Sequence, residues 1–225
     1  MTRKTELAAM NILIVSATPF ELPQIPAYLE KSARSTAHRM TLLVTGIGTA
    51  ATTYSLTTTV IHNKPDLVIQ AGIGGTYDPA FPPGDLVAVE SEIFADLGAT
   101  ENGNLRDLFD LQLVDPDEAP FSSGRLVNNS IFPGGLPALK KVPGATVNSI
   151  SSTPQKAEEI YKKYKVVVES MEGAALHYVC LRQFIPFLQI RAISNFAGER
   201  DKSKWKMKES IGLLNAKLME ILSSL

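Results

Sequence analysis

Short apolar runs alternate with helical stretches along almost the whole chain, and this alternation is what most constrains the fold. Most of the apolar runs lack polar alternation, as expected for strands that are covered on both faces. The predicted strands are residues 12–15, 41–44, 66–69, 85–89, 145–147, 166–168 and 187–193, and the predicted helices are residues 20–31, 49–63, 154–164, 172–183 and 203–224. This order predicts an α/β fold, a three-layer α/β/α sandwich with a mixed, mainly parallel central sheet.

Length and composition favour one such domain over residues 1–225. A chain of 225 residues with 44% hydrophobic residues can bury a substantial core, and no linker-like stretch interrupts it. Residues 94–144 break the regular alternation, because they are rich in Asp, Pro, Gly and Asn. We expect this segment to be a surface excursion or part of an oligomer interface, with one short helical piece near residues 105–109.

The charge balance argues against several classes of partner. A formal net charge of −1 supplies no basic surface for nucleic acid or for an anionic membrane. The apolar runs are far shorter than the about 20 residues of a membrane helix, and no signal-peptide core follows the first residues. We therefore expect a cytoplasmic protein. Cys180 is the only cysteine, so an internal disulfide is excluded, and we expect its thiol to be a buried apolar group.

Two polar motifs lie at the ends of neighbouring predicted strands. Residues 170–175 (SMEGAA) lead from a strand into an apolar helix, so we expect Glu172 at a strand-to-helix turn. Residues 191–195 (RAISN) end the next strand and carry Ser194 and Asn195 into a polar loop. Ligands of open α/β sheets bind where strands end in this way. A carboxylate and an amide in one crevice can hold a ribose and a purine base.

Two glycine-rich stretches also follow predicted strands. Residues 45–51 (TGIGTAA) and 70–76 (QAGIGGT) supply small residues that let a ligand approach the backbone closely. Neither contains the Gly-Lys-Ser/Thr of a Walker A loop, and neither fits the dinucleotide-binding fingerprint. Tight turns that serve packing alone are an equally good interpretation of each stretch by itself.

Five motifs taken together resemble the nucleoside phosphorylase and nucleosidase superfamily. They are residues 16–21 (SATPFE), 45–48, 71–75, 170–175 and 191–195. More narrowly, the chain resembles the hydrolytic branch that contains the methylthioadenosine/S-adenosylhomocysteine nucleosidases and, through its C-terminal part, the futalosine hydrolases. The resemblance implies an enzyme with a small-molecule nucleoside substrate and without a cofactor or metal, assembled as a homodimer or a higher homo-oligomer.

The resemblance also implies roles for single residues. Glu21 would activate water, Glu172 would hold the ribose hydroxyls, and the residue at position 195 would contact the purine. The chemistry agrees, because cleavage of an N-glycosidic bond passes through a ribosyl-cation-like state that needs charge stabilisation, a nucleophile and help for the leaving base. The candidate catalytic residues are Glu21, Glu172 and Asn195, and the candidate substrate contacts are Ile73, Gly75, Thr153, Met171, Ser194 and Trp205.

Asn195 departs from the adenine-specific nucleosidases, which resemble this chain but carry Asp there to protonate N7. An amide cannot act as a general acid, yet its donor and acceptor suit a 6-oxopurine. Futalosine carries hypoxanthine, so Asn195 favours hydrolysis of futalosine, or of a close 5′-modified inosine, to hypoxanthine in menaquinone formation. The other interpretation is that Asn195 only caps the following loop and that Ser194 is a local turn residue.

Arginine decides between hydrolysis and phosphorolysis, because a tightly held phosphate usually draws bidentate Arg. Residues 16–22 and 71–76 contain none, and Ile73 stands where a hydroxyl would help to bind phosphate, so water is the expected nucleophile. The alternatives are a methylthioadenosine-type nucleosidase, a purine nucleoside phosphorylase and a non-catalytic nucleoside sensor. The presence of both Glu21 and Glu172 speaks against the sensor.

Residues 200–206 (RDKSKWK) place one aromatic ring beside several cations, which would suit a carboxyphenyl group on the 5′ side of futalosine. The sequence leaves open which of Arg200, Lys202, Lys204 and Lys206 contacts that tail. Packing of Trp205 as the anchor of the last helix is an equally good interpretation.

Other titratable residues have less defined expectations. Glu169 precedes the motif at 170–175, and strand alternation leaves open whether it supports the site or only the fold. Asp85 follows two prolines and a glycine, so a turn role is expected. The histidines His38, His62 and His177 lie in or beside predicted helices, which leaves Glu21 as the expected base.

Overall fold

A mixed sheet forms the centre of the structure, a computed structural model that describes residues 9–34, 36–132 and 138–225. Its strands in the described residues are β1 (Asn11–Ser16), β2 (Arg39–Val44), β3 (Leu67–Thr76), β4 (Leu86–Glu92), β7 (Leu126–Val127), β8 (Lys140–Thr146), β9 (Val168–Ser170) and β10 (Phe187–Phe196). The order across the sheet is β10-β4-β8-β9-β3-β1-β2, with β7 on β4. Because β10 also pairs with β3, the strands β3, β10, β4, β8 and β9 close into a ring of pairings.

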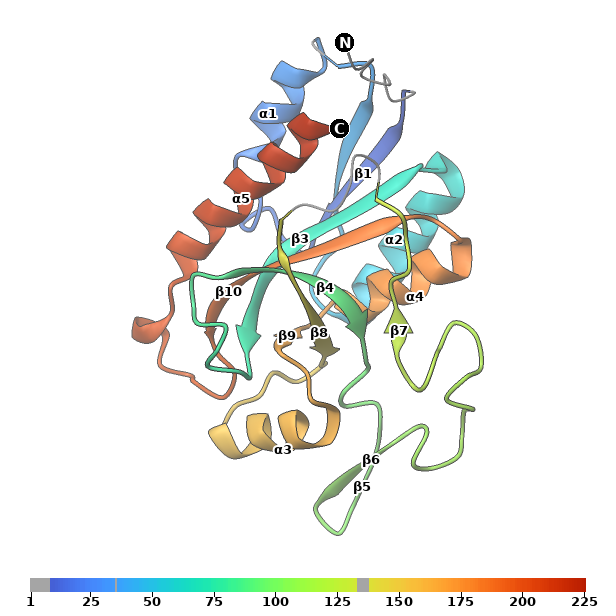
Figure 1. Cartoon of the computed structure of the whole chain (residues 1–225), viewed down its shortest axis with the longest axis vertical. Coiled ribbons are helices and arrows are strands. Elements are labelled where there is room, and N and C mark those ends of the chain that lie inside the picture. Colours follow the sequence, from blue (N-terminus) through green and yellow to red (C-terminus); the bar gives the residue numbers. More distant parts are fainter. Residues whose placement is uncertain (1–8, 35, 133–137) are drawn as a thin grey trace.

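Helices cover both faces of this sheet, which confirms the three layers predicted from the sequence (Figure 1). The helices α1 (Ile25–Ser32) and α5 (Met207–Ser224) lie on one face, and α2 (Thr49–Asn63) and α4 (Gly173–Gln183) lie on the other. The helix α3 (Pro154–Tyr164) packs beside β8. No helix among the described residues has the length and apolar character to cross a membrane.

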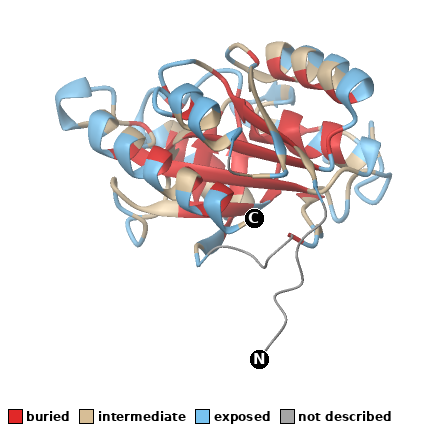
Figure 2. Ribbon diagram, turned by 90° about the horizontal axis from the view of Figure 1, so that it is seen from above, coloured by how far each residue is buried: buried red, intermediate tan, exposed pale blue. Residues whose placement is uncertain are grey.

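The apolar strands are buried on both faces because each face meets a helical layer. In β1, Ile12 and Ile14 pack with α1 and α5, while Leu13 and Val15 pack with α2 and α4. Figure 2 shows the same pattern, with buried central strands and helices that expose their outer surfaces. The strands therefore lack polar alternation because both faces of the sheet are covered, as inferred from the sequence.

Two predicted strand ends are wrong, because the strands continue through the motifs that follow them. Residues 70–76, predicted as a turn, belong to β3, and residues 194–196 belong to β10 rather than to a loop. The two strands pair in parallel from residue 68 of β3 to its end, so each provides hydrogen-bond partners for the other. A bulge between Ile193 and Asn195 shifts the register near the end of β10.

The excursion at 94–144 contains a hairpin where a helical piece was predicted near 105–109. The strands β5 (Gly98–Glu101) and β6 (Asn104–Asp107) pair antiparallel. Between them, Asn102 and Gly103 have φ of 52° and 81°, and two successive left-handed residues make the tight turn that such hairpins favour.

Two predicted helices start later than expected. The helix α1 starts at Ile25 instead of residue 20, since residues 17–24 form turns. The helix α5 starts at Met207 instead of residue 203, after a short 3-10 turn over Lys202–Lys204. Both starts leave the preceding segment free to line the pocket described next.

Candidate active site

A pocket of about 470 Å³ opens at the carboxyl ends of β1, β3, β9 and β10. Of the residues singled out in the sequence, it is lined by Glu21, Ile73, Gly75, Met171, Glu172, Ser194, Asn195 and Trp205. Thr153 lies outside the lining, and its hydroxyl instead accepts a hydrogen bond of 3.2 Å from the backbone N–H of Lys156 at the start of α3. The strand ends thus bring together residues that are far apart in the sequence.

Glu21 is buried in the turn after β1, and several donors fix its carboxylate. Oε1 accepts from the backbone N–H of Ile73 at 3.1 Å. Oε2 accepts from the backbone N–H of Thr18 at 3.1 Å and from the hydroxyl of Ser16 at 3.3 Å. The turn itself is tied to α5, where the buried Asn215 donates from Nδ2 to the backbone oxygen of Glu21 at 2.8 Å. The carboxylate is therefore held in one orientation at the pocket wall.

Glu172 precedes the first turn of α4, as the sequence predicted, and is also buried. Its Oε1 accepts from the backbone N–H of Gly48 at 2.9 Å, so the glycine-rich loop at 45–48 approaches it directly. Nη1 of Arg191 lies 3.6 Å from Oε2. Burial raises the pKa of Glu172, and the Arg191 charge and the Gly48 N–H oppose that rise.

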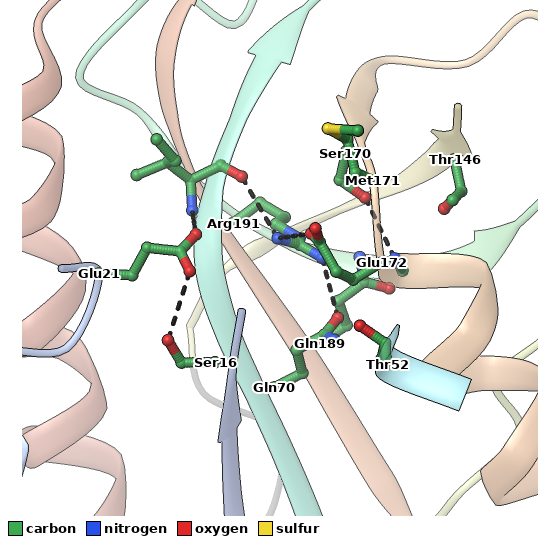
Figure 3. A network of polar contacts seen from close by, with 12 residues as sticks. Ser16, Glu21, Thr52, Gln70, Thr146, Ser170, Met171, Glu172, Gln189 and Arg191 are labelled. Carbon is green, nitrogen blue, oxygen red and sulfur yellow. Dashed lines mark hydrogen bonds and ion pairs between the residues drawn. The ribbon is translucent and has the colours of Figure 1, made fainter. Parts of the chain in front are cut away.

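Arg191 is the cation of the site, although it was not among the candidate residues. Its side chain is 1% exposed and lies between Glu21 and Glu172, beneath the pocket rather than on its wall (Figure 3). Nη1 donates to the backbone oxygen of Ile73 at 3.3 Å, and Nη2 donates to Oε1 of Gln70 at 2.9 Å. With these partners, the guanidinium is bound by protein groups rather than by a ligand. It orients the carboxylate of Glu172 from the side away from the pocket.

Asn195 lies at the bulge of β10 with its amide held at both ends. The hydroxyl of Ser194 donates to Oδ1 at 2.7 Å, and Nδ2 donates to the backbone oxygen of Phe196 at 2.9 Å. Gly75 is its partner on β3, and a β-carbon there would stand 3.3 Å from Nδ2. Ser194 therefore orients Asn195, and the second N–H of the amide has no hydrogen-bond partner among the described residues.

The outer part of the pocket is apolar and carries a single cation. Among the described residues Arg200 is the only cationic one in the lining, and its guanidinium lies 5.5 Å from the centre of the Trp205 ring. Trp205 is itself fixed by a hydrogen bond of 3.1 Å from its ring N–H to the backbone oxygen of Glu199. Phe20 and Ile47, 82% and 63% exposed, stand on the wall near the opening.

The three lysines of the same segment do not line this pocket. Lys204 pairs with Glu199 at 2.6 Å, and Lys206 lies 3.9 Å from Glu209. Lys202 is exposed. Of the four cations left open by the sequence, Arg200 is the one placed to meet a ligand.

Two buried carboxylates lie near the site: Glu169, whose role the sequence left open, and Glu92, which sequence reasoning missed. Glu169 lines the pocket and accepts hydrogen bonds from Tyr77 and Ser151. Glu92 is also buried, and Gln189 donates to its Oε1 at 2.9 Å while Thr146 donates to its Oε2 at 3.0 Å. Burial raises the pKa of Glu92 to about 7. The partners of both carboxylates lie elsewhere in the chain, so only the tertiary structure identifies them.

The remaining reactive side chains belong to the core. Cys180 is buried, as predicted, and burial raises the pKa of its thiol. His177 is buried as well, with Nδ1 2.9 Å from the backbone oxygen of Leu126, and burial lowers its pKa to about 4. Within the described ranges, no three His, Cys, Asp or Glu side chains are grouped to hold a metal ion.

Comparisons with known proteins agree with this geometry. A sequence profile of the phosphorylase superfamily matches residues 11–225. A futalosine hydrolase of Thermus thermophilus is 29% identical, with 80% of each chain covered, and a 5′-methylthioadenosine/S-adenosylhomocysteine nucleosidase of Geobacillus kaustophilus is 31% identical, with 70% of this chain and 67% of the relative covered. The crystal structure of the corresponding nucleosidase of Helicobacter pylori, bound to butyl-thio-DADMe-Immucillin-A, superposes with a TM-score of 0.79 at 16% identity and covers 97% of this chain and 100% of that chain.

Proposed function

The chain belongs to the phosphorylase superfamily, and we propose that it hydrolyses the N-glycosidic bond of futalosine to release hypoxanthine. The observation that carries this proposal is the amide of Asn195, whose Oδ1 is occupied by the Ser194 hydroxyl and whose Nδ2 keeps one N–H for a ligand. A donor that cannot release its proton suits N7 or O6 of a 6-oxopurine. Relatives named futalosine hydrolase point to the same substrate class.

The reaction requires stabilisation of the leaving base, stabilisation of the ribosyl cation and activation of water. Asn195, Glu172 and Glu21 are proposed for these three roles. As the C1′–N9 bond breaks, its electron pair goes to the base, which the Asn195 N–H holds until water protonates it. Glu172 accepts hydrogen bonds from the ribose hydroxyls, and its charge faces the positive charge that builds on the sugar. Glu21 takes a proton from the water that forms the new bond to C1′.

Water rather than phosphate is the proposed nucleophile, because among the residues that the structure describes no cation is free beside the carboxylates. Arg191 is sealed beneath the site and bonded to Ile73 and Gln70. Arg200 lies by Trp205, at the end of the described lining that would receive the substrate tail. A phosphate next to Glu21 and Glu172 would meet two carboxylates, and the one cation described between them, Arg191, is already bound to the protein.

The 5′ tail would occupy the apolar part of the pocket. Phe20, Ile47 and Trp205 offer apolar and aromatic surface there, and Arg200 offers a charge partner for a carboxylate. A methylthioadenosine-type nucleosidase is the second candidate, because such relatives share the fold and one is 31% identical. Position 195 separates the two candidates, since an adenine base gains from an acid that can protonate it.

A direct assay tests the proposal. The protein is incubated with futalosine, inosine and methylthioadenosine, each with and without phosphate, and the free base is followed by chromatography. Phosphate-independent release of hypoxanthine from futalosine supports the proposal. Adenine from methylthioadenosine as the main product, or a strict need for phosphate, contradicts it.

The variant Glu21→Gln separates catalysis from binding. We expect turnover to fall by about 10²- to 10⁴-fold, because a positioned general base contributes that much, while hypoxanthine still binds. A parent protein that binds nucleosides without turnover, and whose binding is unchanged in Glu21→Gln, would indicate a sensor.

A further inference from the structure

The buried positions of α5 are apolar except for two polar side chains. The apolar residues of α5 belong to the same core cluster as Leu22 and Ile25, so the helix packs against the turn after β1 and against α1 (Figure 1). Ser210 and Asn215 are the two polar residues, and both are completely buried. A buried polar group costs free energy unless it is hydrogen-bonded, so each of these side chains is expected to have a partner in the structure that it packs against.

Asn215 uses every polar atom of its amide. Nδ2 donates to the backbone oxygen of Glu21 and to that of Ile211, both at 2.8 Å. Oδ1 accepts from the backbone N–H of Gln24 at 3.2 Å. Two of the three hydrogen bonds therefore join α5 to the turn that carries Glu21, at both ends of residues 21–24. An apolar side chain could fill the same space, but it would leave these backbone groups without partners.

Asn215 is the polar attachment of this turn's main chain to the rest of the fold. Within the described residues, the backbone of residues 19–24 has hydrogen-bond partners outside residues 16–32 only in Asn215. Leu22 is buried and holds the turn against the core, but apolar packing is not directional. The hydrogen bonds to Asn215 therefore set the orientation of the Glu21 main chain, from which the Glu21 side chain extends.

The carboxylate of Glu21 depends on that orientation. Glu21 lines the pocket, and its carboxylate accepts from the backbone N–H groups of Thr18 and Ile73, at 3.1 Å each. A main-chain displacement of about 1 Å would break this alignment, and an error of that size in a reacting group can lower the rate by about 10²-fold. Asn215 does not itself line the pocket, so its effect on the reaction must pass through the turn that it holds.

We propose that Asn215 is a positioning residue, which fixes the main chain of Glu21 so that its carboxylate faces the water that attacks C1′. This rests on the proposed function, in which Glu21 is the general base. In this arrangement Asn215 exchanges no proton and contacts no substrate. Its contribution is to kcat, because a base held in the wrong orientation still leaves the contacts to the purine in place.

Ser210 provides a matched control on the same helix. Its hydroxyl donates to the backbone oxygen of Ile193 at 2.7 Å. That oxygen also accepts from the backbone N–H of Gly84 at 2.8 Å, and Ile193 is held within β10 by its pairing with β3. Ser210→Ala therefore removes a buried hydrogen bond of α5 without releasing the strand that it contacts or the turn of Glu21. This loss should lower the melting temperature but leave kcat unchanged.

Two variants of Asn215 test the proposal by kinetics and binding. Asn215→Ala and Asn215→Leu both remove the hydrogen bonds, and leucine keeps the branched shape of asparagine without its donors or acceptor. We expect kcat for futalosine to fall about 10- to 100-fold in both variants, while calorimetry gives a Kd for hypoxanthine within about threefold of the parent value. In Ser210→Ala both quantities should stay within about threefold of the parent.

Three results would overturn the proposal. The first is kcat within about threefold of the parent in both Asn215 variants. The second is a loss of kcat in only one of them, which would assign the effect to a change of volume rather than to the hydrogen bonds. The third is an equal loss in Ser210→Ala, or an equal loss of hypoxanthine affinity, which would assign the effect to a general loosening of α5.

A measurement without turnover separates this proposal from the function on which it rests. The backbone N–H of Ile73 donates to the carboxylate of Glu21, so its NMR amide signal reports the position of that carboxylate. The signal should shift in Asn215→Leu and stay in place in Ser210→Ala. A parent that hydrolyses futalosine, with kcat and this signal unchanged in Asn215→Leu, would overturn the role of Asn215 alone. A parent without turnover, in which Asn215→Leu shifts the signal, would overturn the proposed function alone.

Discussion

The backbone of Gly72 lies directly beneath the guanidinium of Arg191, so close that a β-carbon at position 72 would stand 2.5 Å from Nη1. The two residues are partners in the pairing of β3 with β10, and their side chains would share one face. The same β-carbon would stand 2.8 Å from Oε1 of Glu21. The missing side chain is therefore what lets a buried arginine pass between the two carboxylates.

The first prediction is that Gly72→Ala disables the site. The methyl group must displace Arg191 or Glu21, both buried and hydrogen-bonded, so we expect kcat to fall by at least about 100-fold. The strain should also cost about 1–3 kcal/mol of unfolding free energy. Steady-state kinetics and urea denaturation measure the two effects. The control is Gly212→Ala on α5, where a β-carbon would meet no described atom within 4 Å beyond its chain neighbours and the helix backbone, and stability should rise slightly. Unchanged kcat in Gly72→Ala would refute the steric argument.

The layers, and most of the candidate residues that line the pocket, could be predicted from the sequence, but the role of these glycines could not. The sequence shows small residues after an apolar run, which favours a turn. Only the pairing of β3 with β10 shows that Gly72 and Gly75 are strand residues opposite Arg191 and Asn195. Long-range register is not encoded in local periodicity, so the reason for a glycine at each position becomes visible only when the partner strand is known.

The hairpin after β4 was missed for a different reason. The pair Asn102 and Gly103 is a strong local turn signal, yet it lies in a polar segment without the alternating flanks that usually accompany a strand. Glu92 and Glu169 are a third case, since the donors that hold each carboxylate lie far from it in the sequence. Buried polar networks of this kind depend on tertiary contacts alone.

The second prediction concerns the choice of base. Asn195→Asp removes the free N–H and adds a group that can carry a proton to N7, while the Ser194 hydroxyl can still orient it. We expect kcat/KM for a 6-oxopurine nucleoside to fall about 10- to 100-fold, and that for methylthioadenosine to rise. Base release from both substrates gives the ratio. Asn195→Ala should lose the first activity without a gain in the second, and an unchanged ratio in Asn195→Asp would contradict the assigned contact.

The third prediction concerns the substrate tail. Arg200→Ala removes the only cation of the described lining, so KM for futalosine should rise about 3- to 10-fold, as expected for an exposed charge pair beside an aromatic ring. Inosine has no tail, and its KM should stay the same. Lys202→Ala is the matched control, because Lys202 is exposed and lies outside the lining. Equal effects of Arg200→Ala on both substrates would place the tail elsewhere.

The fourth prediction is a pH dependence of stability set by Glu92. Burial raises its pKa from 4.5 to about 7, and Gln189, Arg191 and Thr146 only partly oppose that rise. Between these two values the folded chain holds a proton that the unfolded chain has released. The stabilisation is therefore complete below pH 4.5 and is lost as the pH rises through 7, to a total of about 3 kcal/mol.

Glu92→Gln removes this titration and keeps the shape of the side chain. The unfolding free energy of the variant should therefore increase relative to that of the parent as the pH rises from 5 to 8. Urea denaturation at half-unit pH steps measures the difference, which should approach about 3 kcal/mol across the full range. Glu90→Gln is the matched control for the loss of one carboxylate, because Glu90 lies exposed on the same strand. If Glu92→Gln and the parent show parallel pH profiles, the buried carboxyl does not hold a proton in the folded state near neutral pH, and its charge must be neutralised by Arg191 instead.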